Sequence, residues 1–292
     1  MKEFFKNLWR LTRPLSSVKN VALVLVAFYF SSKAFNLPKI ILGTLFLSLV
    51  SSAVYAYNTI NDVKIDRENK NKKHYSQAAE YFGNKKSYVI ILLFLLAALA
   101  GSLLFNVYFF AALLILFLNG FLYSCKYTRF KEKPVLDVFF GALTPFLLRF
   151  SAAWFVFQIS VPPLLPLIFL VCAKTGGYIL YKELDRPYLA KLNIKNSTTY
   201  FGYESKIIAS IILFLISFLS FLLLCFNSLF NFNPELWGKM PLYFLFLIIL
   251  AIPPLIIIYL MNILKIYTKV NEFRVLGYYY WIVIIIFILF IV

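Results

Sequence analysis

The sequence has 292 residues, of which 62% are hydrophobic and only 14% are charged. A soluble globular domain carries about 25% charged residues, and the apolar residues here come in runs long enough to cross a bilayer. The composition therefore excludes a soluble domain and predicts an integral membrane protein. The net charge of +17 does not indicate nucleic-acid binding. The basic residues instead cluster in short segments between the apolar runs, where they set orientation and meet anionic head groups.

Nine apolar runs predict an all-α bundle of nine transmembrane helices. No internal repeat or low-complexity tract divides the chain, so a single domain over residues 1–292 is expected. The predicted spans lie at about 17–35, 39–58, 87–105, 108–125, 135–157, 162–182, 207–227, 240–262 and 276–292.

The basic residues alternate from one connection to the next. They gather in residues 1–13, an amphipathic segment without a cleavage site, and after the second, fourth, sixth and eighth runs. The positive-inside rule therefore predicts a cytoplasmic N-terminus and a C-terminus on the opposite side. The connections after the second, fourth and sixth runs also carry most acids, amides and hydroxyls, so we expect the active site to face the cytoplasm. The residue usage suggests a prokaryotic cell (inner) membrane.

The first candidate site follows the second apolar run. Asn58, Asp62 and Asp66 are spaced four residues apart, so on one helix they share a face. Two carboxylates and an amide suit a hard cation such as Mg²⁺, which prefers oxygen ligands and is often shared with substrate phosphates. The alternative is a solvated loop in which neighbouring lysine and arginine side chains balance the acids.

Basic residues form two further candidates. The cations of residues 127–131, Lys131 among them, could grip a diphosphate, although taken alone they are better explained as interfacial anchors of the helix. Arg149 and Lys174 lie inside apolar runs, where a cation costs at least ~2.5–3.5 kcal/mol on insertion scales. We therefore expect each to face a polar cavity, with a structural ion pair as the alternative.

The fourth candidate is the segment 181–186, at the end of the sixth run. It contains Lys182 and Glu183 and predicts a second acidic patch that faces the first across a cavity. Solvated charges at a helix end account for it equally well. The one histidine, His74, lies in a Lys-rich loop, so chemistry based on histidine is not expected.

These residues resemble the UbiA-type intramembrane prenyltransferase superfamily. That family has nine transmembrane helices and the motif N-D-x-x-D-x-x-x-D-R after the second. Residues 127–131 look like its Y-x-x-x-K after the fourth helix, and Leu148 and Arg149 fall where it carries L-R. The residues that match the acidic motif are Asn58, Thr59, Asp62, Asp66 and Arg67.

Within the superfamily, the chain is most similar to decaprenyl-phosphate phosphoribosyltransferases. The likeness lies in residues 13–20, 52–58 and 62–68, and in the K-E-L of residues 182–184. Two departures stand out. Thr59 replaces the first aspartate of the motif, which removes one expected carboxylate. The second acidic motif also lacks the D-x-x-x-D spacing of ordinary prenyltransferases, which agrees with the phosphoribosyl branch.

The resemblance implies a role for each candidate residue. Mg²⁺ is expected on Asn58, Asp62 and Asp66, and catalysis on Asp62, Asp66 and Arg149. The residues expected to bind substrate or phosphate are Lys19, Arg67, Tyr127, Lys131, Lys174, Lys182 and Glu183.

The implied reaction moves 5-phosphoribosyl from its diphosphate donor to a polyprenyl phosphate and releases diphosphate. The first alternative is a prenyltransferase that moves a prenyl group from a prenyl diphosphate to an aromatic or polar acceptor. The second is a lipid-binding homologue without catalytic activity, which the loss of an aspartate at Thr59 motivates. The expected partners are one of these lipids, a phosphorylated co-substrate and the surrounding membrane lipids.

Overall fold

The computed structural model describes residues 1–70, 72–230, 237, 238, 240, 282 and 285. Every regular element of this described part is helical, as expected for an all-α bundle. The α-helices are α1 (Lys2–Thr12), α2 (Val18–Ser31), α3 (Leu37–Asn61), α4 (Val63–Glu68), α5 (Lys73–Ser102), α6 (Val107–Ser124), α7 (Leu136–Val138), α8 (Thr144–Phe155), α9 (Leu164–Lys182), α10 (Arg186–Lys191), α11 (Ser197–Tyr200) and α12 (Tyr203–Phe230).

Seven helical segments of the described residues are long and apolar enough to cross a membrane. Each matches one of the first seven predicted spans. The segments are Pro14–Ser31, Leu37–Asn61, Lys73–Ser102, Val107–Ser124, Leu136–Phe155, Leu164–Lys191 and Tyr203–Asn227. The predicted spans at 240–262 and 276–292 fall almost entirely outside the described residues, so the count of nine stays a prediction.

The third predicted span begins just after a kink in α5, and a more polar helical segment precedes it. Helix α5 begins at Lys73 rather than near residue 87. The backbone breaks inside it at Gly83, whose φ of 64° lies in the region that glycine adopts without steric cost. The first segment is polar on one face only, because Ala78, Ala79 and Phe82 are buried against the core. A short amphipathic helix of this kind has too little hydropathy to stand out from the loop around it.

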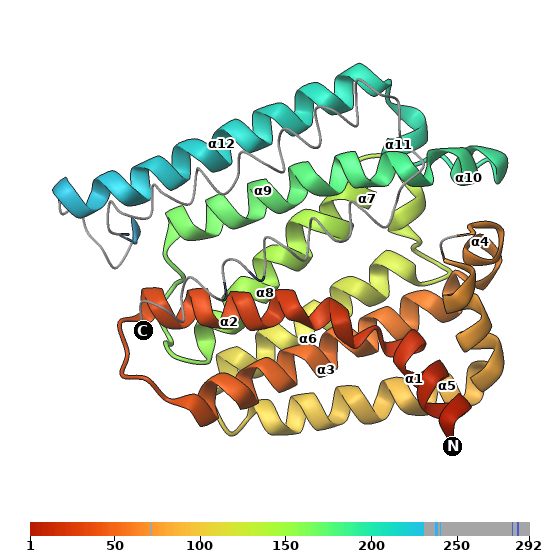
Figure 1. Cartoon of the computed structure of the whole chain (residues 1–292), viewed down its shortest axis with the longest axis horizontal. Helices are drawn as coiled ribbons and strands as arrows, with labels where there is room; N and C mark the ends of the chain where they lie inside the picture. The colour runs from red at the N-terminus through yellow and green to blue at the C-terminus, as the bar shows by residue number, and fades with distance from the viewer. Residues whose placement is uncertain (71, 231–236, 239, 241–281, 283–284, 286–292) are drawn as a thin grey trace.

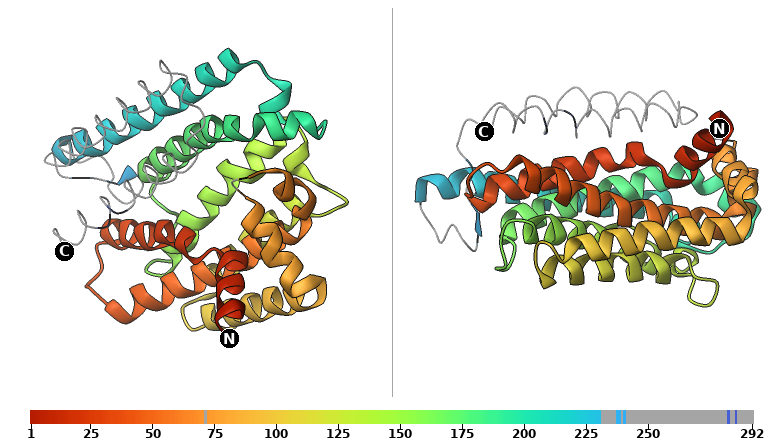
Figure 2. Two further views of the ribbon diagram at one scale, coloured as in Figure 1. Left: turned by 45° about the vertical axis from the view of Figure 1, so that its right-hand side comes forward. Right: turned by 90° about the horizontal axis from the view of Figure 1, so that it is seen from below.

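The helices pack mainly in antiparallel neighbours. Helix α9 lies along α12, α3 along α5, and α6 along α8, while α2 crosses in contact with α8 (Figure 1). Large side chains fill the space between them, among them Phe109, Phe146 and Phe150, each less than 2% exposed. The short helices α4, α10 and α11 gather at one end of the bundle, at the right of Figure 1, and Figure 2 shows the same end from two other sides. Polar connections that are distant in sequence therefore meet there.

Close contact between α3 and α6 gives a first test of this packing. A Cβ atom added at Gly120 would collide with both methyl groups of Val54. Overpacking of this kind costs about 1–3 kcal/mol, so we expect Gly120→Ala to lower the thermal stability measured in detergent. The matched control is Gly177→Ala, because an added Cβ there meets no atom within 4 Å. Combining Gly120→Ala with Val54→Ala should restore part of the loss, and equal stability of the two alanine variants would contradict the packing.

Candidate functional site

A narrow polar pocket lies where the connections after α3, α6 and α9 meet. Its open volume is about 50 Å³, because its own charged side chains fill most of the space. We call it the charged pocket. It is lined by Asp62, Ile65, Asp66, Asn69, Lys72, Lys131, Glu132, Lys182, Asp185, Tyr188, Leu189, Ile194 and Asn196. Four of the predicted site residues thus come together: Asp62, Asp66, Lys131 and Lys182.

The acidic motif does not lie on one continuous helix. Helix α3 ends at Asn61, and Asp62 leaves the helical conformation with φ −108° and ψ 9°. The backbone N–H of Asp66 still donates to the carbonyl of Asp62 at 2.8 Å, so α4 restarts directly and both carboxylates enter the pocket. Asn58 lies further back in α3, outside the pocket lining, and its side-chain oxygen accepts a 2.6 Å hydrogen bond from the Ser124 hydroxyl. Asn58 therefore does not line the charged pocket together with the two aspartates.

Asp62 and Lys131 form a buried ion pair that joins two of the three connections. The two residues are only 8% and 7% exposed. Burial lowers the pKa of Lys131, and the Asp62 carboxylate opposes that shift. Asn196 fixes the backbone at this point by donating its amide to the carbonyl of Lys131 at 3.3 Å. The lysine is thus held with its charge directed at the first aspartate of the pocket.

Asp66 is buried beside Asp62 and is only partly compensated by a cation. Its nearest basic group is the guanidinium of Arg13, at 3.8 Å, which also donates to the Thr59 hydroxyl at 2.8 Å. Burial, followed by repulsion from the Asp62 carboxylate, raises the pKa of Asp66 to about 6. Two carboxylates this close need a positive charge between them. Among the described residues, no three His, Cys, Asp or Glu side chains converge to bind a metal by themselves. Any metal would therefore take its other ligands from elsewhere.

The third connection contributes Asp185 rather than the predicted Glu183. The Nζ of Lys72 lies 2.7 Å from one carboxylate oxygen of Asp185, and the Nζ of Lys182 lies 3.7 Å from the same oxygen. Helical positions three residues apart share a side, so Asp185 follows Lys182 into the pocket. Glu183 points to a different side, where it pairs with Lys206 of α12.

A second cluster of cations lies deeper, among the membrane-spanning helices. The amine of Lys19 donates to the hydroxyl of Tyr55, and Arg149 and Lys174 act electrostatically on the same tyrosine. Arg149 is 7% exposed, and its Nε has no hydrogen-bond partner within the described part of the chain. We call these four residues the deep cluster. The structure therefore brings together three further predicted residues, Lys19, Arg149 and Lys174.

The deep cluster and the charged pocket are linked through one arginine. The guanidinium of Arg13 lies 5.7 Å from the centroid of the Tyr55 ring and 3.6 Å from that of Tyr75. Arg13 thus touches Tyr55 on one side and Asp66 on the other. Arg13 therefore lies near a residue of the deep cluster and near a residue of the charged pocket.

Two predicted phosphate-binding residues lie elsewhere. The side chain of Arg67 is 60% exposed and pairs with Glu80 on α5, and Tyr127 is 92% exposed. Arg67 follows Asp66 directly, so the helical turn directs it away from the pocket. Both residues lie outside the charged pocket.

Several pocket residues were missed from the sequence. Arg13 belongs to a segment that carried the family likeness, and Asp185 lies in the predicted acidic segment 181–186 but was given no role of its own. No sequence pattern pointed to Lys72 and Asn69, because they lie among other polar residues. Their partner, Asp185, is more than 110 positions further along the chain.

The raised pKa of Asp66 predicts how stability depends on pH in metal-free protein. Between about pH 4 and pH 6 the folded state keeps a proton that the unfolded state releases, so this group adds stability as the pH falls through 6. Relative to Asp66→Asn, the wild type should therefore gain up to about 3 kcal/mol between pH 7 and pH 4. Thermal unfolding in EDTA measures the difference.

A surface carboxylate gives the control for this experiment. The pKa of Glu68 is lowered by its hydrogen bond to Lys191, so its contribution is lost as the pH falls. Relative to Glu68→Gln, the wild type should lose stability over the same range. A wild-type gain that is equally large relative to both variants, or absent for Asp66→Asn, would contradict the assignment.

The fold of this chain is similar to that of known membrane proteins. A structure of a UbiA homologue from Archaeoglobus fulgidus bound to GPP and Mg²⁺ matches with a TM-score of 0.65 and 22% identity, over 96% of this chain and 99% of that one. An apo UbiA homologue from Aeropyrum pernix K1 matches with a TM-score of 0.70 and 15% identity, over 94% and 97% of the two chains.

A third match is a structure described for digeranylgeranylglyceryl phosphate synthase in membranes. Its TM-score is 0.67 at 17% identity, over 98% of this chain and 97% of that one. No curated protein sequence matches the chain. The profile of the UbiA prenyltransferase family matches residues 20–283, which is most of the sequence. The chain is an integral membrane protein and belongs to the UbiA prenyltransferase family.

Proposed function

We propose that this protein is a Mg²⁺-dependent intramembrane transferase that displaces diphosphate from its donor in the charged pocket. The observation that carries the proposal is the pairing of two buried carboxylates of the pocket with cations: Asp62 with Lys131, and Asp185 with Lys72 and Lys182. A metal–diphosphate complex contains both signs of charge. When such a complex binds, its metal can contact the carboxylates and its phosphates can contact the lysines. These contacts replace the ion pairs, so the charges are compensated both before and after binding.

The donor set fits Mg²⁺ held partly by substrate. Mg²⁺ is commonly bound by one or two carboxylates together with substrate phosphates. Asp62 and Asp66 supply two carboxylates. Burial, and after it repulsion from Asp62, raises the pKa of Asp66, and a divalent cation beside the two carboxylates favours their ionised forms. When bound, Mg²⁺ supplies electrostatic stabilisation of the departing diphosphate. Asn58 is assigned no contact with the metal, because its side-chain oxygen is engaged by Ser124.

The deep cluster supports a second anionic substrate. Cations among apolar helices are costly unless an anion joins them, and Lys19, the buried Arg149 and Lys174 all act on one tyrosine, Tyr55. A polyprenyl phosphate that enters between the helices would place its phosphate there and its tail against the apolar core. This observation favours transfer of 5-phosphoribosyl from its diphosphate to a polyprenyl phosphate.

In this reaction a phosphate oxygen of the lipid attacks the C1 atom of the ribose. The bond from C1 to the diphosphate oxygen breaks, and the electron pair leaves with the diphosphate. Lys72, Lys131 and Lys182 stabilise the developing negative charge on the leaving group. Arg149 and Lys19 hold the attacking phosphate. No general base is required, because the nucleophile is already ionised.

A conventional prenyltransferase is the second candidate function. It is favoured by the GPP and Mg²⁺ bound to the Archaeoglobus fulgidus homologue, and by DMAPP and Mg²⁺ bound to the same protein. The deep cluster argues against it here, because cations beside an allylic carbocation would raise its energy. We further propose that the charged pocket faces the cytoplasm of a prokaryotic cell, since the connections that form it carry most of the basic residues.

An activity assay in nanodiscs with Mg²⁺ separates these functions. One reaction contains labelled phosphoribosyl diphosphate and a polyprenyl phosphate, and the other contains a prenyl diphosphate and aromatic acceptors. We expect label to enter the lipid fraction in the first reaction only. Asp62→Asn, Lys182→Gln and Arg149→Gln should each lower the rate about 100-fold or more, because each removes a charge from a substrate phosphate or its metal.

Two variants serve as controls, because they change predicted site residues that the structure places outside the charged pocket. Arg67→Gln and Tyr127→Phe should keep the rate within about threefold, because both side chains lie outside the pocket. Product in the second reaction only would overturn phosphoribosyl transfer in favour of prenyl transfer. Absence of product in both reactions, with folded protein, would favour a lipid-binding homologue without activity.

A further inference from the structure

The N-terminal helix α1 presents two faces that the proposed reaction does not use. Phe5 and Trp9, four residues apart, share one face and are 63% and 55% exposed. The opposite side packs against α5, where Leu11 is fully buried and Phe4 meets Phe82 edge to face at 5.4 Å. Exposed aromatic residues next to basic ones on a helix before the first span are typical of a helix that lies in the membrane interface.

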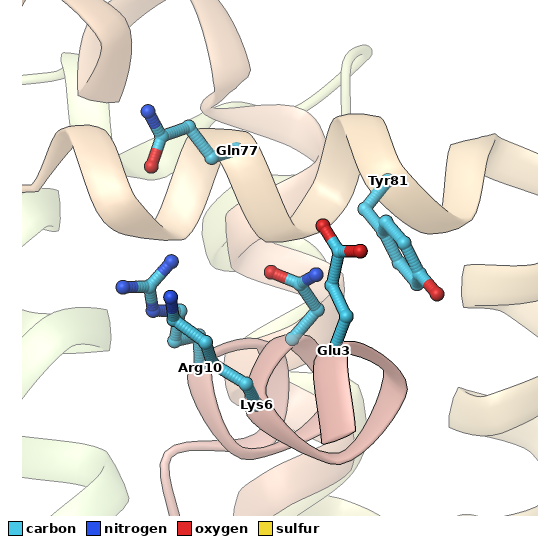
Figure 3. Close-up of a pocket in the computed structure, with 6 residues that line it drawn as sticks. Glu3, Lys6, Arg10, Gln77 and Tyr81 are labelled. Atoms are coloured by element: carbon cyan, nitrogen blue, oxygen red, sulfur yellow. The ribbon is translucent and has the colours of Figure 1, made fainter. Parts of the chain in front are cut away.

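A polar pocket opens between α1 and α5, and it shares no residue with the charged pocket. Its volume is about 190 Å³. Figure 3 shows Lys6 and Arg10 directed to one part of this gap and the carboxylate of Glu3 to another, nearer Tyr81. We call it the interfacial pocket. Its lining residues are Glu3, Lys6, Asn7 and Arg10 of α1, and Gln77 and Tyr81 of α5.

The charges of this pocket are not compensated by one another. Nine ion pairs occur among the described residues, and none of them contains Glu3, Lys6 or Arg10. Glu3 and Lys6 do not pair although they are only three positions apart. Asn7 is only 6% exposed and adds an amide to the pocket lining. The pocket therefore presents one carboxylate and two cations to a ligand that carries both signs of charge.

We propose that the interfacial pocket binds the aminoalkyl phosphate head group of phosphatidylethanolamine. Lys6 and Arg10 would hold the phosphate, with the amides of Asn7 and Gln77 completing its hydrogen bonds. Glu3 would accept the ammonium hydrogens, and the exposed Phe5 and Trp9, on another face of α1, place the helix in the membrane interface where such head groups lie. A purely anionic head group would leave Glu3 opposed by a like charge, and a trimethylated amine could donate no hydrogen bond to it.

Binding of short-chain lipids to the full-length protein in neutral detergent tests the proposal. Isothermal titration would compare dihexanoyl phosphatidylethanolamine, phosphatidylcholine and phosphatidylglycerol with free phosphoethanolamine. We expect the ethanolamine lipid to bind about tenfold more tightly than each of the other three probes, since it alone satisfies both charges and both chains. Equal binding of the choline lipid, or of free phosphoethanolamine, would overturn the assignment.

Matched variants separate the pocket from the general positive charge of the chain. Lys6→Gln/Arg10→Gln should weaken binding of the ethanolamine lipid about tenfold or more, and Glu3→Gln should abolish its preference over the choline lipid. The control Lys2→Gln/Lys85→Gln removes the same charge outside the pocket and should leave binding within about twofold. Gln77→Glu should weaken binding while Asn84→Asp, the same change further along α5, should not. Equal losses in variant and control would overturn the proposal.

Discussion

The buried ion pair between Lys131 and Asp62 is the contact on which the arrangement of the site depends. It ties the end of α3 to the connection after α6, and removing one partner of such a pair leaves an uncompensated charge at a cost of about 3–5 kcal/mol. The Asp185 pairs tie in the third connection in the same way. Pairs of this kind hold charges in place without substrate. A ligand that carries both signs can then replace the partners with little rearrangement of the backbone.

Much of the fold could be predicted from the sequence, because a bilayer imposes a strong and simple requirement on helix length and hydropathy. The first seven apolar runs each correspond to a helix that could span a membrane. The break in α5 at Gly83 and the polar helix before it could not be predicted in this way. Their positions follow from tertiary contacts with α1 and α3, and the hydropathy pattern of the local sequence does not reveal such contacts.

The candidate site was predictable in type but not in every member. Motif likeness identified Asp62, Asp66 and Lys131, since their spacing carries the chemistry. It failed for Arg67, which the turn of α4 directs to the surface, and for Glu183, which pairs with α12 while the nearby Asp185 enters the pocket. A shift of one or two positions along a helix changes the direction in which a charged side chain points. A motif match does not show whether that direction is toward the pocket or toward the surface.

The central claim is that the two aspartates of the charged pocket bind a divalent metal together with diphosphate. Mn²⁺ in place of Mg²⁺ makes this visible, because pulsed electron paramagnetic resonance detects coupling between bound Mn²⁺ and phosphorus. With added diphosphate, the wild type and the surface control Glu80→Gln should show this coupling, and Asp66→Asn should not. Mn²⁺ bound equally by all three proteins, or bound without phosphorus coupling, would contradict the account.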